Sequence, residues 1–101
     1  MANQFGAKIK NLRESNHLFQ REIATVLNTD TPMLSKIERG KKKAKKEQIA
    51  VFEKILKVKK DELLVLWLVD QVLELVGNKP VALKAINLAQ QEIKELFNTN
   101  S

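Results

Sequence analysis

The sequence predicts an all-α fold, and three observations support this prediction. Only three glycines and two prolines occur among the 101 residues. Residues with high helix propensity, chiefly Ala, Leu, Lys, Glu and Gln, are abundant throughout the chain. Apolar residues recur at intervals of three and four positions, whereas strand-like alternation and hairpin dipeptides are missing from the sequence. A chain of this length and composition is expected to fold as one globular unit.

The first two helices are predicted from the spacing of their apolar residues. Phe5, Ile9 and Leu12 follow one another at helical intervals and give one apolar stripe over residues 3–15. Over residues 20–27 the apolar positions again fall on one side, which predicts a second helix of about two turns. Both helices are thus expected to turn one face toward a common core.

The third helix is predicted from signals at both of its ends. Asn28 is expected to adopt the left-handed conformation of a tight break after the preceding helix. Asp30 has the position of an N-cap, and Pro32 lies in a first turn that does not need its missing amide hydrogen. Gly40 is expected to end this helix, which therefore covers residues 31–39.

Three further helices are expected over residues 46–57, 61–76 and 80–97, each with recurring apolar residues. Gly77 and Asn78 separate the last two helices, because this pair ends one helix and allows the next to begin. The apolar residues of 61–76 spread around more of the helix than one core-facing stripe requires. This helix is therefore expected to carry a second apolar surface.

Charge divides the chain into a basic and a weakly acidic part. The whole chain carries a formal net charge of +6. Residues 1–60 contain fifteen Lys and Arg against six Asp and Glu, a net charge of +9, whereas residues 61–101 carry −3. A strongly basic first part favours a polyanionic partner such as nucleic acid.

The composition argues against catalysis, metal binding and export. Cysteine is absent, which excludes disulfides and thiolate sites and fits a reducing cytoplasm. The longest apolar run, residues 63–69, is far shorter than the about 20 residues of a membrane span, and residues 1–10 lack the core of a secretory signal. No glycine loop, carboxylate pair or nucleophile with a histidine partner can be assembled, and the one histidine, His17, lies at a helix end. We expect no enzymatic activity, metal, cofactor or membrane contact.

Several segments in order resemble one family of DNA-binding domains. Two short helices joined by a tight turn have the proportions of a helix-turn-helix. LFQREIA at 18–24, LSKIERGK at 34–41 and DELL at 61–64 resemble the phage-repressor and Cro-like (xenobiotic-response-element) family over residues 5–64. The resemblance implies a compact five-helix repressor-type domain with an additional C-terminal helix. In such a domain the third helix enters the major groove of DNA.

This resemblance also predicts which residues touch DNA. The base-contacting positions of the third helix are matched by Thr31, Pro32, Ser35 and Lys36. Phosphate contacts are expected from Gln20, Lys41, Lys42, Lys43, Lys45 and Lys46, although the lysine run could also be a merely solvated loop. Pro32 stands where many relatives have a hydrogen-bonding side chain. Arg13 and Glu38 match a pair that orients the recognition helix from behind, and the alternative is two separate solvated charges.

The chain is accordingly divided into a helix-turn-helix DNA-binding domain, residues 1–64, and a C-terminal helical extension, residues 65–101. The extension is expected to pack on the same domain and to form a homodimer, and the sixth helix could either complete one enlarged core or join a partner. The expected interface residues are Leu66, Trp67, Val69, Leu73, Ile86 and Ile93.

The sequence therefore predicts a cytoplasmic transcriptional regulator that binds double-stranded DNA. We expect a repressor or autoregulator that binds a two-fold symmetric operator as a homodimer. The alternative is an antitoxin-type interaction module whose C-terminal helices neutralise a protein partner. A different protein that co-purifies tightly with this chain from the native cell would favour the antitoxin-type module over the plain regulator.

Overall fold

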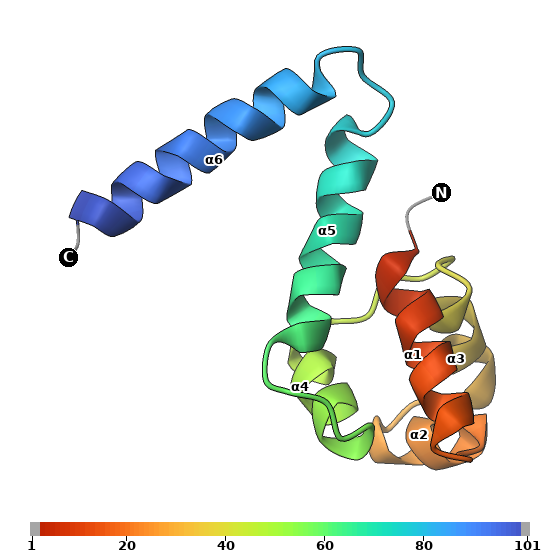
Figure 1. Cartoon of the computed structure of the whole chain (residues 1–101). Helices are drawn as coiled ribbons and strands as arrows, with labels where there is room; N and C mark the ends of the chain where they lie inside the picture. Colours follow the sequence, from red (N-terminus) through yellow and green to blue (C-terminus); the bar gives the residue numbers. More distant parts are fainter. Residues whose placement is uncertain (1–2, 100–101) are drawn as a thin grey trace.

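The computed structural model describes residues 3–99 and contains six α-helices, with no strand among the described residues. The helices are α1 Gln4–Ser15, α2 Gln20–Val26, α3 Thr31–Glu38, α4 Lys46–Ile55, α5 Glu62–Val76 and α6 Ala82–Thr99 (Figure 1). The prediction of an all-α fold is confirmed. Residues 1–2 and 100–101, which belong to the two expected domain ranges, lie outside the described residues.

The observed helix limits differ from the predicted ones mainly where a helix gives way to its cap. Leu27 and Arg39 are the C-cap residues of α2 and α3, so these helices end one residue before the predicted limits. At the end of α4, Lys57 has a φ of 59°, which no α-helix accommodates. The predicted left-handed conformation of Asn28 is confirmed, because its φ is 57°. α6 begins later than predicted: Ala82 N–H closes a turn on the carbonyl of Lys79, and the helical hydrogen bonds begin with Ala85 N–H to the carbonyl of Val81.

One hydrophobic core lies between α1, α2, α3, α4 and the beginning of α5. The rings of Phe5 from α1 and Phe52 from α4 meet edge to face at its centre, with centroids 5.6 Å apart and an interplanar angle of 84°. The core cluster consists of Phe5, Ile9, Ile23, Leu27, Leu34, Ile37, Ala44, Ile49, Phe52, Leu56 and Leu63. These residues hold α3 from behind and leave its other face open.

A carboxylate of α5 fastens that helix to the beginning of α1. Asp70 Oδ1 accepts a hydrogen bond from Gln4 N–H at 2.7 Å, and Asp70 Oδ2 accepts one from Phe5 N–H at 2.9 Å. The first amide groups of a helix have no partner within the helix and carry its positive dipole end, so a carboxylate is well placed there. Asp70 therefore caps α1 from a distant part of the chain.

α6 does not pack against α1–α4, whereas the α5 part of the expected C-terminal extension does, through Leu66, Trp67 and Asp70. Residues 83–98 are all exposed, and Figure 1 shows α6 diverging from α5 after the turn that joins them. The Cα radius of gyration is 15.8 Å, compared with about 13 Å for a compact domain of this length. The turn at residues 77–81 directs α6 away, so its apolar side chains remain uncovered within one chain.

Candidate nucleic-acid interface

α3 has one buried face and one outward face. Leu34 and Ile37 turn into the core, where they are 0% and 3% exposed, and Glu38 is buried beside them. Asp30 caps the helix, because its side chain accepts a hydrogen bond from Met33 N–H at 2.8 Å. Residues that are not on the buried side of such an anchored helix must face outward.

The outward face of α3 carries a small apolar group and two positive charges. Pro32, Lys36 and Arg39 follow one another at intervals of four and three positions and are exposed, so they lie on one side of the helix. Thr31 and Ser35, which are expected to contact bases, are half-buried at the edges of this face. Arg39 is absent from the predicted set, although its helical spacing from Lys36 would have identified it.

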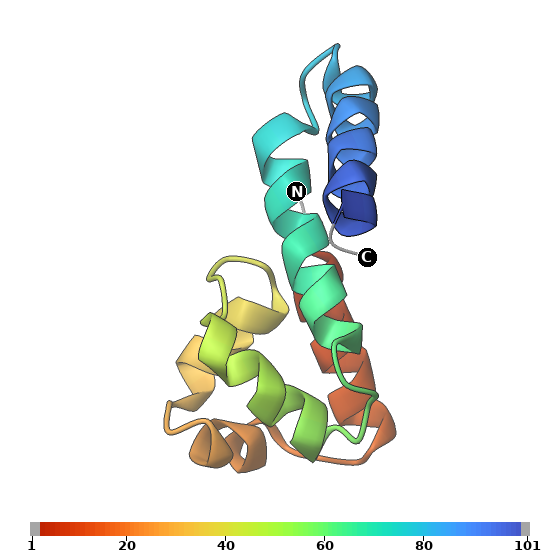
Figure 2. The same ribbon diagram turned by 90° about the vertical axis from the view of Figure 1, so that its left-hand side faces the viewer.

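α2, α3 and the loop after α3 lie on the side of the domain away from α6 (Figure 2). Figure 1 gives the same arrangement from a second direction. The outward face of α3 is therefore not obstructed by the C-terminal extension.

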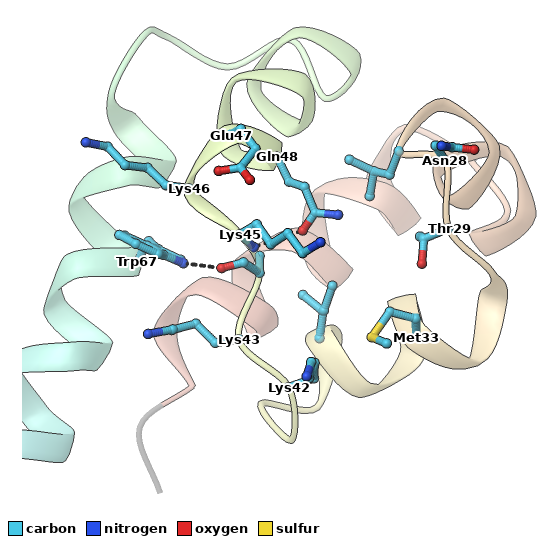
Figure 3. A pocket seen from close by; sticks show the side chains of 13 residues that line it. Asn28, Thr29, Met33, Lys42, Lys43, Lys45, Lys46, Glu47, Gln48 and Trp67 are labelled. Carbon is cyan, nitrogen blue, oxygen red and sulfur yellow. Dashed lines mark hydrogen bonds between the residues drawn. The ribbon is translucent and has the colours of Figure 1, made fainter.

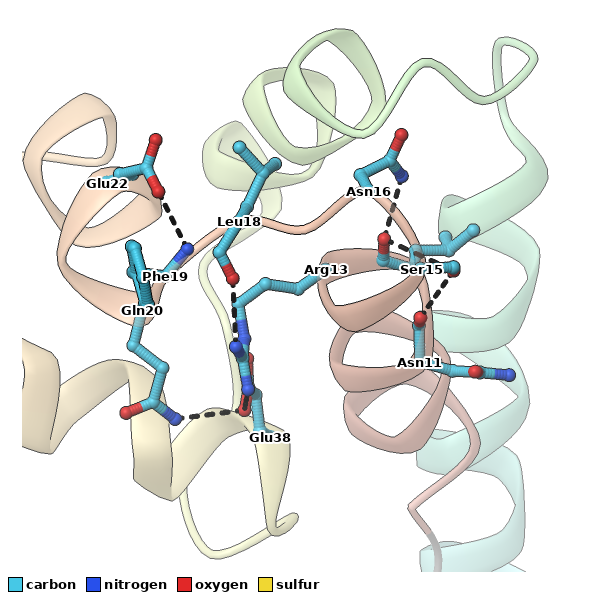
Figure 4. Close-up of polar contacts among 10 residues, drawn as sticks. Asn11, Arg13, Ser15, Asn16, Leu18, Phe19, Gln20, Glu22 and Glu38 are labelled. Carbon is cyan, nitrogen blue, oxygen red and sulfur yellow. Dashed lines mark hydrogen bonds and ion pairs between the residues drawn. The ribbon is translucent and has the colours of Figure 1, made fainter.

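Arg13 and Glu38 form an ion pair behind α3. Arg13 Nε donates to Glu38 Oε2 at 2.7 Å and Arg13 Nη2 donates to Glu38 Oε1 at 3.1 Å, so the pair is bidentate (Figure 4). Arg13 Nη1 also donates to the carbonyl of Leu18, 3.1 Å away in the segment before α2. One guanidinium group thus connects α1, the start of α2 and the end of α3.

The ion pair is shielded from water and involves a third side chain. The side chains of Arg13 and Glu38 are only 12% and 2% exposed. The hydrogen bonds to Glu38 raise the pKa of the Arg13 guanidinium above its already high ordinary value. Gln20 Nε2 donates to Glu38 Oε1 at 3.0 Å. Gln20, which is expected to contact a DNA phosphate, therefore already uses one amide hydrogen inside the protein.

α1 and α3 approach each other closely through a glycine. An added Cβ at Gly6 would lie 2.7 Å from the carbonyl oxygen of Glu38 and would also meet that of Ile37. Asn3 Nδ2 donates to the same Glu38 carbonyl at 3.2 Å. The end of α3 is therefore supported by the beginning of α1, which Asp70 in turn caps.

The lysine loop, residues 41–46, follows the C-cap of α3 and Gly40 and extends to the first residue of α4. Its five lysines are all exposed, whereas Ala44 between them is 2% exposed and belongs to the core. Gly40 has a φ of +75°, and the N–H groups of Lys41 and Lys42 return to the carbonyl of Lys36 at 2.8 and 3.3 Å. The loop is thus tightly connected to the end of α3 despite its concentration of like charge.

A groove of about 590 Å³ separates the lysine loop from the turn between α2 and α3 (Figure 3). Lysines and uncharged polar side chains line it together with apolar residues, among them Trp67, and with the carboxylate of Glu47. Its lining includes Asn28, Thr29, Met33, Lys42, Lys45 and Gln48. An open groove that carries several lysines beside α3 can accommodate a phosphate backbone.

The expected dimer-interface residues lie in different environments. Leu66 and Trp67 are half-buried against the core, and Trp67 Nε1 donates to the carbonyl of Ala44 at 2.8 Å. Val69 and Leu73 on α5 are 37% and 38% exposed. On α6, Ile86 is 36% and Ile93 is 52% exposed.

The described residues contain no group of three His, Asp or Glu side chains that could hold a metal ion. Among residues 3–99, every helix is too short or too polar to span a bilayer.

Comparison with known proteins identifies the family. Residues 9–63, more than half of the chain, match the family described as Helix-turn-helix. Among curated proteins, no sequence is significantly similar to this chain. The fold is similar to the crystal structure of the clp gene regulator ClgR from Corynebacterium glutamicum, with a TM-score of 0.58, 19% identity, and coverage of 98% of this chain and 92% of that chain. The chain therefore belongs to the Cro/C1-type helix-turn-helix family of DNA-binding transcriptional regulators.

Proposed function

We propose that the chain is a sequence-specific repressor or autoregulator that binds a two-fold symmetric operator as a homodimer. The observation that carries this proposal is the outward face of α3, where Pro32, Lys36 and Arg39 are exposed on a helix fixed from behind. A rigid helix with an uncovered face and a basic flank is suited to the major groove.

Lys36 is the residue that we assign to base recognition. Its ammonium group can donate to guanine O6 and N7, two acceptors that no A·T pair presents together in the major groove. Pro32 and Thr31 offer apolar contact to a thymine methyl group and no strong hydrogen-bonding pattern. We therefore expect modest direct readout, with part of the specificity coming from the deformability of the operator.

Phosphate contacts surround this face. The lysine loop supplies exposed positive charge directly after α3. Gln20 uses one amide hydrogen for Glu38, and its second amide hydrogen remains able to donate to a phosphate oxygen. Arg39 adds a charge between Lys36 and the loop.

The homodimer is supported by two apolar stripes that one chain leaves open. Val65, Leu68 and Val72 on α5 are 56%, 49% and 43% exposed. On α6, Ile86, Ile93 and Phe97 lie along one side and are also exposed. A second copy of the chain would cover both stripes and would place two recognition helices at two half-sites.

The test compares two lysine variants on two DNA duplexes. An operator is first selected from random-sequence duplexes with the full-length protein, and a scrambled duplex serves as the second probe. Lys36→Ala should lose about 1 to 3 kcal/mol on the operator and much less on the scrambled duplex. Lys42→Ala, which removes the same charge from the loop, should lose equally on both.

Equal losses of Lys36→Ala on both duplexes would contradict the assignment of Lys36 as a base contact. Failure to select any preferred sequence would contradict specific recognition altogether. The sign of regulation is measured separately, by placing the selected operator within a reporter promoter, where the proposal predicts lower expression in the presence of the protein.

A further inference from the structure

Trp67 lies beside the lysine loop and holds its backbone. Trp67 Nε1 donates to the carbonyl of Ala44 at 2.8 Å, and Ala44 is 2% exposed. Trp67 itself belongs to α5, outside the helices that form the helix-turn-helix. The midpoint of the loop is therefore fixed from α5, although the loop begins at α3.

The same indole also engages one of the five lysines. Lys43 Nζ is 5.7 Å from the centroid of the Trp67 ring, which is a cation–π distance. Lys41 and Lys42, by contrast, donate their backbone N–H groups to the carbonyl of Lys36 at the end of α3. The loop is thus held at three places: by α3 at Lys41 and Lys42, by α5 at Lys43 and Ala44, and by α4 at Lys45, whose N–H donates to Gln48 Oε1.

Figure 3 shows the result for the side chains. Lys43 extends toward α5 and Trp67, whereas Lys45 extends to the other side, away from α5, although both line the same groove. Lys42 lies next to the end of α3. The lysines of the loop therefore do not present one uniform surface.

We propose that Trp67 is a positioning residue for DNA binding, which fixes the loop and holds Lys43 against α5, so that Lys42 and Lys45 contact phosphates and Lys43 does not. This inference rests on the proposed function, because it takes the loop to lie along a DNA backbone.

Two physical effects support this role. Five ammonium groups within six residues repel one another, and the attraction of one ammonium group to an aromatic face offsets part of that repulsion. A loop fixed at its midpoint also loses less conformational entropy when it meets a ligand than a free loop does. Trp67 therefore holds the loop in place for DNA binding without contacting the DNA itself.

The experiment measures how the affinity of the full-length protein for a mixed-sequence DNA duplex depends on salt. Lys42→Ala and Lys43→Ala are matched variants, because they remove the same charge from adjacent positions of the same loop. Lys42→Ala should reduce the log–log salt slope by about 0.9, the value of one phosphate contact. Lys43→Ala should leave the slope unchanged.

Fluorescence gives a second readout, because Trp67 is the one tryptophan of the chain. Lys43→Ala should shift the emission of the free protein, since the cation over the indole is removed. The difference between wild type and Lys43→Ala should persist on the duplex, because Lys43 stays on the ring. Trp67→Phe, which keeps an aromatic ring but loses the N–H donor, should weaken binding several-fold while far-UV circular dichroism is unchanged.

Equal reductions of the slope in Lys42→Ala and Lys43→Ala would overturn the role of Trp67 while leaving the proposed DNA contact of the loop intact. An unchanged slope in both variants would overturn the phosphate contact and the inference together. Convergence of the two emission spectra on the duplex would show that DNA withdraws Lys43 from Trp67, which also contradicts the inference.

Discussion

Glu38 is a buried charged side chain whose carboxylate is fully engaged by two neighbours. Arg13 binds both of its oxygens and Gln20 donates to one of them, so the first three helices meet at this group. A buried ion pair often adds little net stability compared with apolar residues, but removing one partner leaves the other charge without compensation. Glu38 is therefore a residue whose loss should be costly.

Glu38→Ala should destabilise the protein by about 3 kcal/mol, because it strands the guanidinium of Arg13 in a site that water barely reaches. Glu74→Ala, at an exposed position of α5, is the control and should change stability by no more than about 0.5 kcal/mol. Urea unfolding at one protein concentration measures both. Similar losses in the two variants would contradict the special role of Glu38.

The dependence of this contribution on pH follows from the raised pKa of Arg13. A base whose pKa is raised by folding contributes stability that is present below its unfolded pKa and is lost as pH rises through the folded value. For an arginine both values lie far above neutrality. The difference between wild type and Glu38→Ala should thus not be lost as pH rises through neutral and mildly alkaline values.

Some residue roles could be predicted from the sequence and others could not. Asp30 and Asn28 were identifiable because capping and left-handed turns depend on neighbouring residues. Asp70 caps α1 from 65 or more positions away, and no local pattern indicates such a contact. Trp67 is expected at the dimer interface from its place among apolar residues, and its hydrogen bond to the carbonyl of Ala44, 23 positions away, is a further contact that no local pattern indicates.

At the scale of elements, the end of α4 contains a non-glycine residue in the left-handed region. Lys57 has a φ of 59° and is exposed, and Val58 N–H donates to the carbonyl of Glu53 at 3.1 Å across this turn. The arrangement is a helix C-terminal motif that usually contains glycine. The lysine side chain therefore imposes a steric cost that glycine would not.

Lys57→Gly should stabilise the protein by about 0.5 to 1 kcal/mol, because it relieves this cost. Lys60→Gly is the matched control: it removes the same charge at a nearby exposed position whose φ is not positive. It should lower stability, since glycine only adds freedom to the unfolded chain there. Thermal unfolding compares them, and a stabilised Lys60→Gly would indicate relief of charge repulsion instead of backbone strain.

At the scale of the whole molecule, α6 is the element whose environment the sequence left open. Its apolar stripe was predictable from helical spacing, but periodicity cannot say whether the covering surface belongs to the same chain or to another. In the structure α6 extends away from the domain and its side chains from 83 to 98 are exposed. Figures 1 and 2 show α6 on the side of the molecule away from α2, α3 and the lysine loop.

The homodimer can be tested with two aspartate substitutions on α6. Ile93 shares one side of the helix with Ile86 and Phe97, whereas Leu88, two positions after Ile86, points away from that side. The two side chains are similarly exposed in a single chain, 52% and 57%, so solvent exposure alone would make the substitutions equivalent. Ile93→Asp should convert the dimer to a monomer, because it would bury a charge in the proposed interface. Leu88→Asp should remain a dimer. Sedimentation equilibrium measures both, and a wild-type chain that sediments as a monomer would contradict the homodimer and favour a different protein partner for α6.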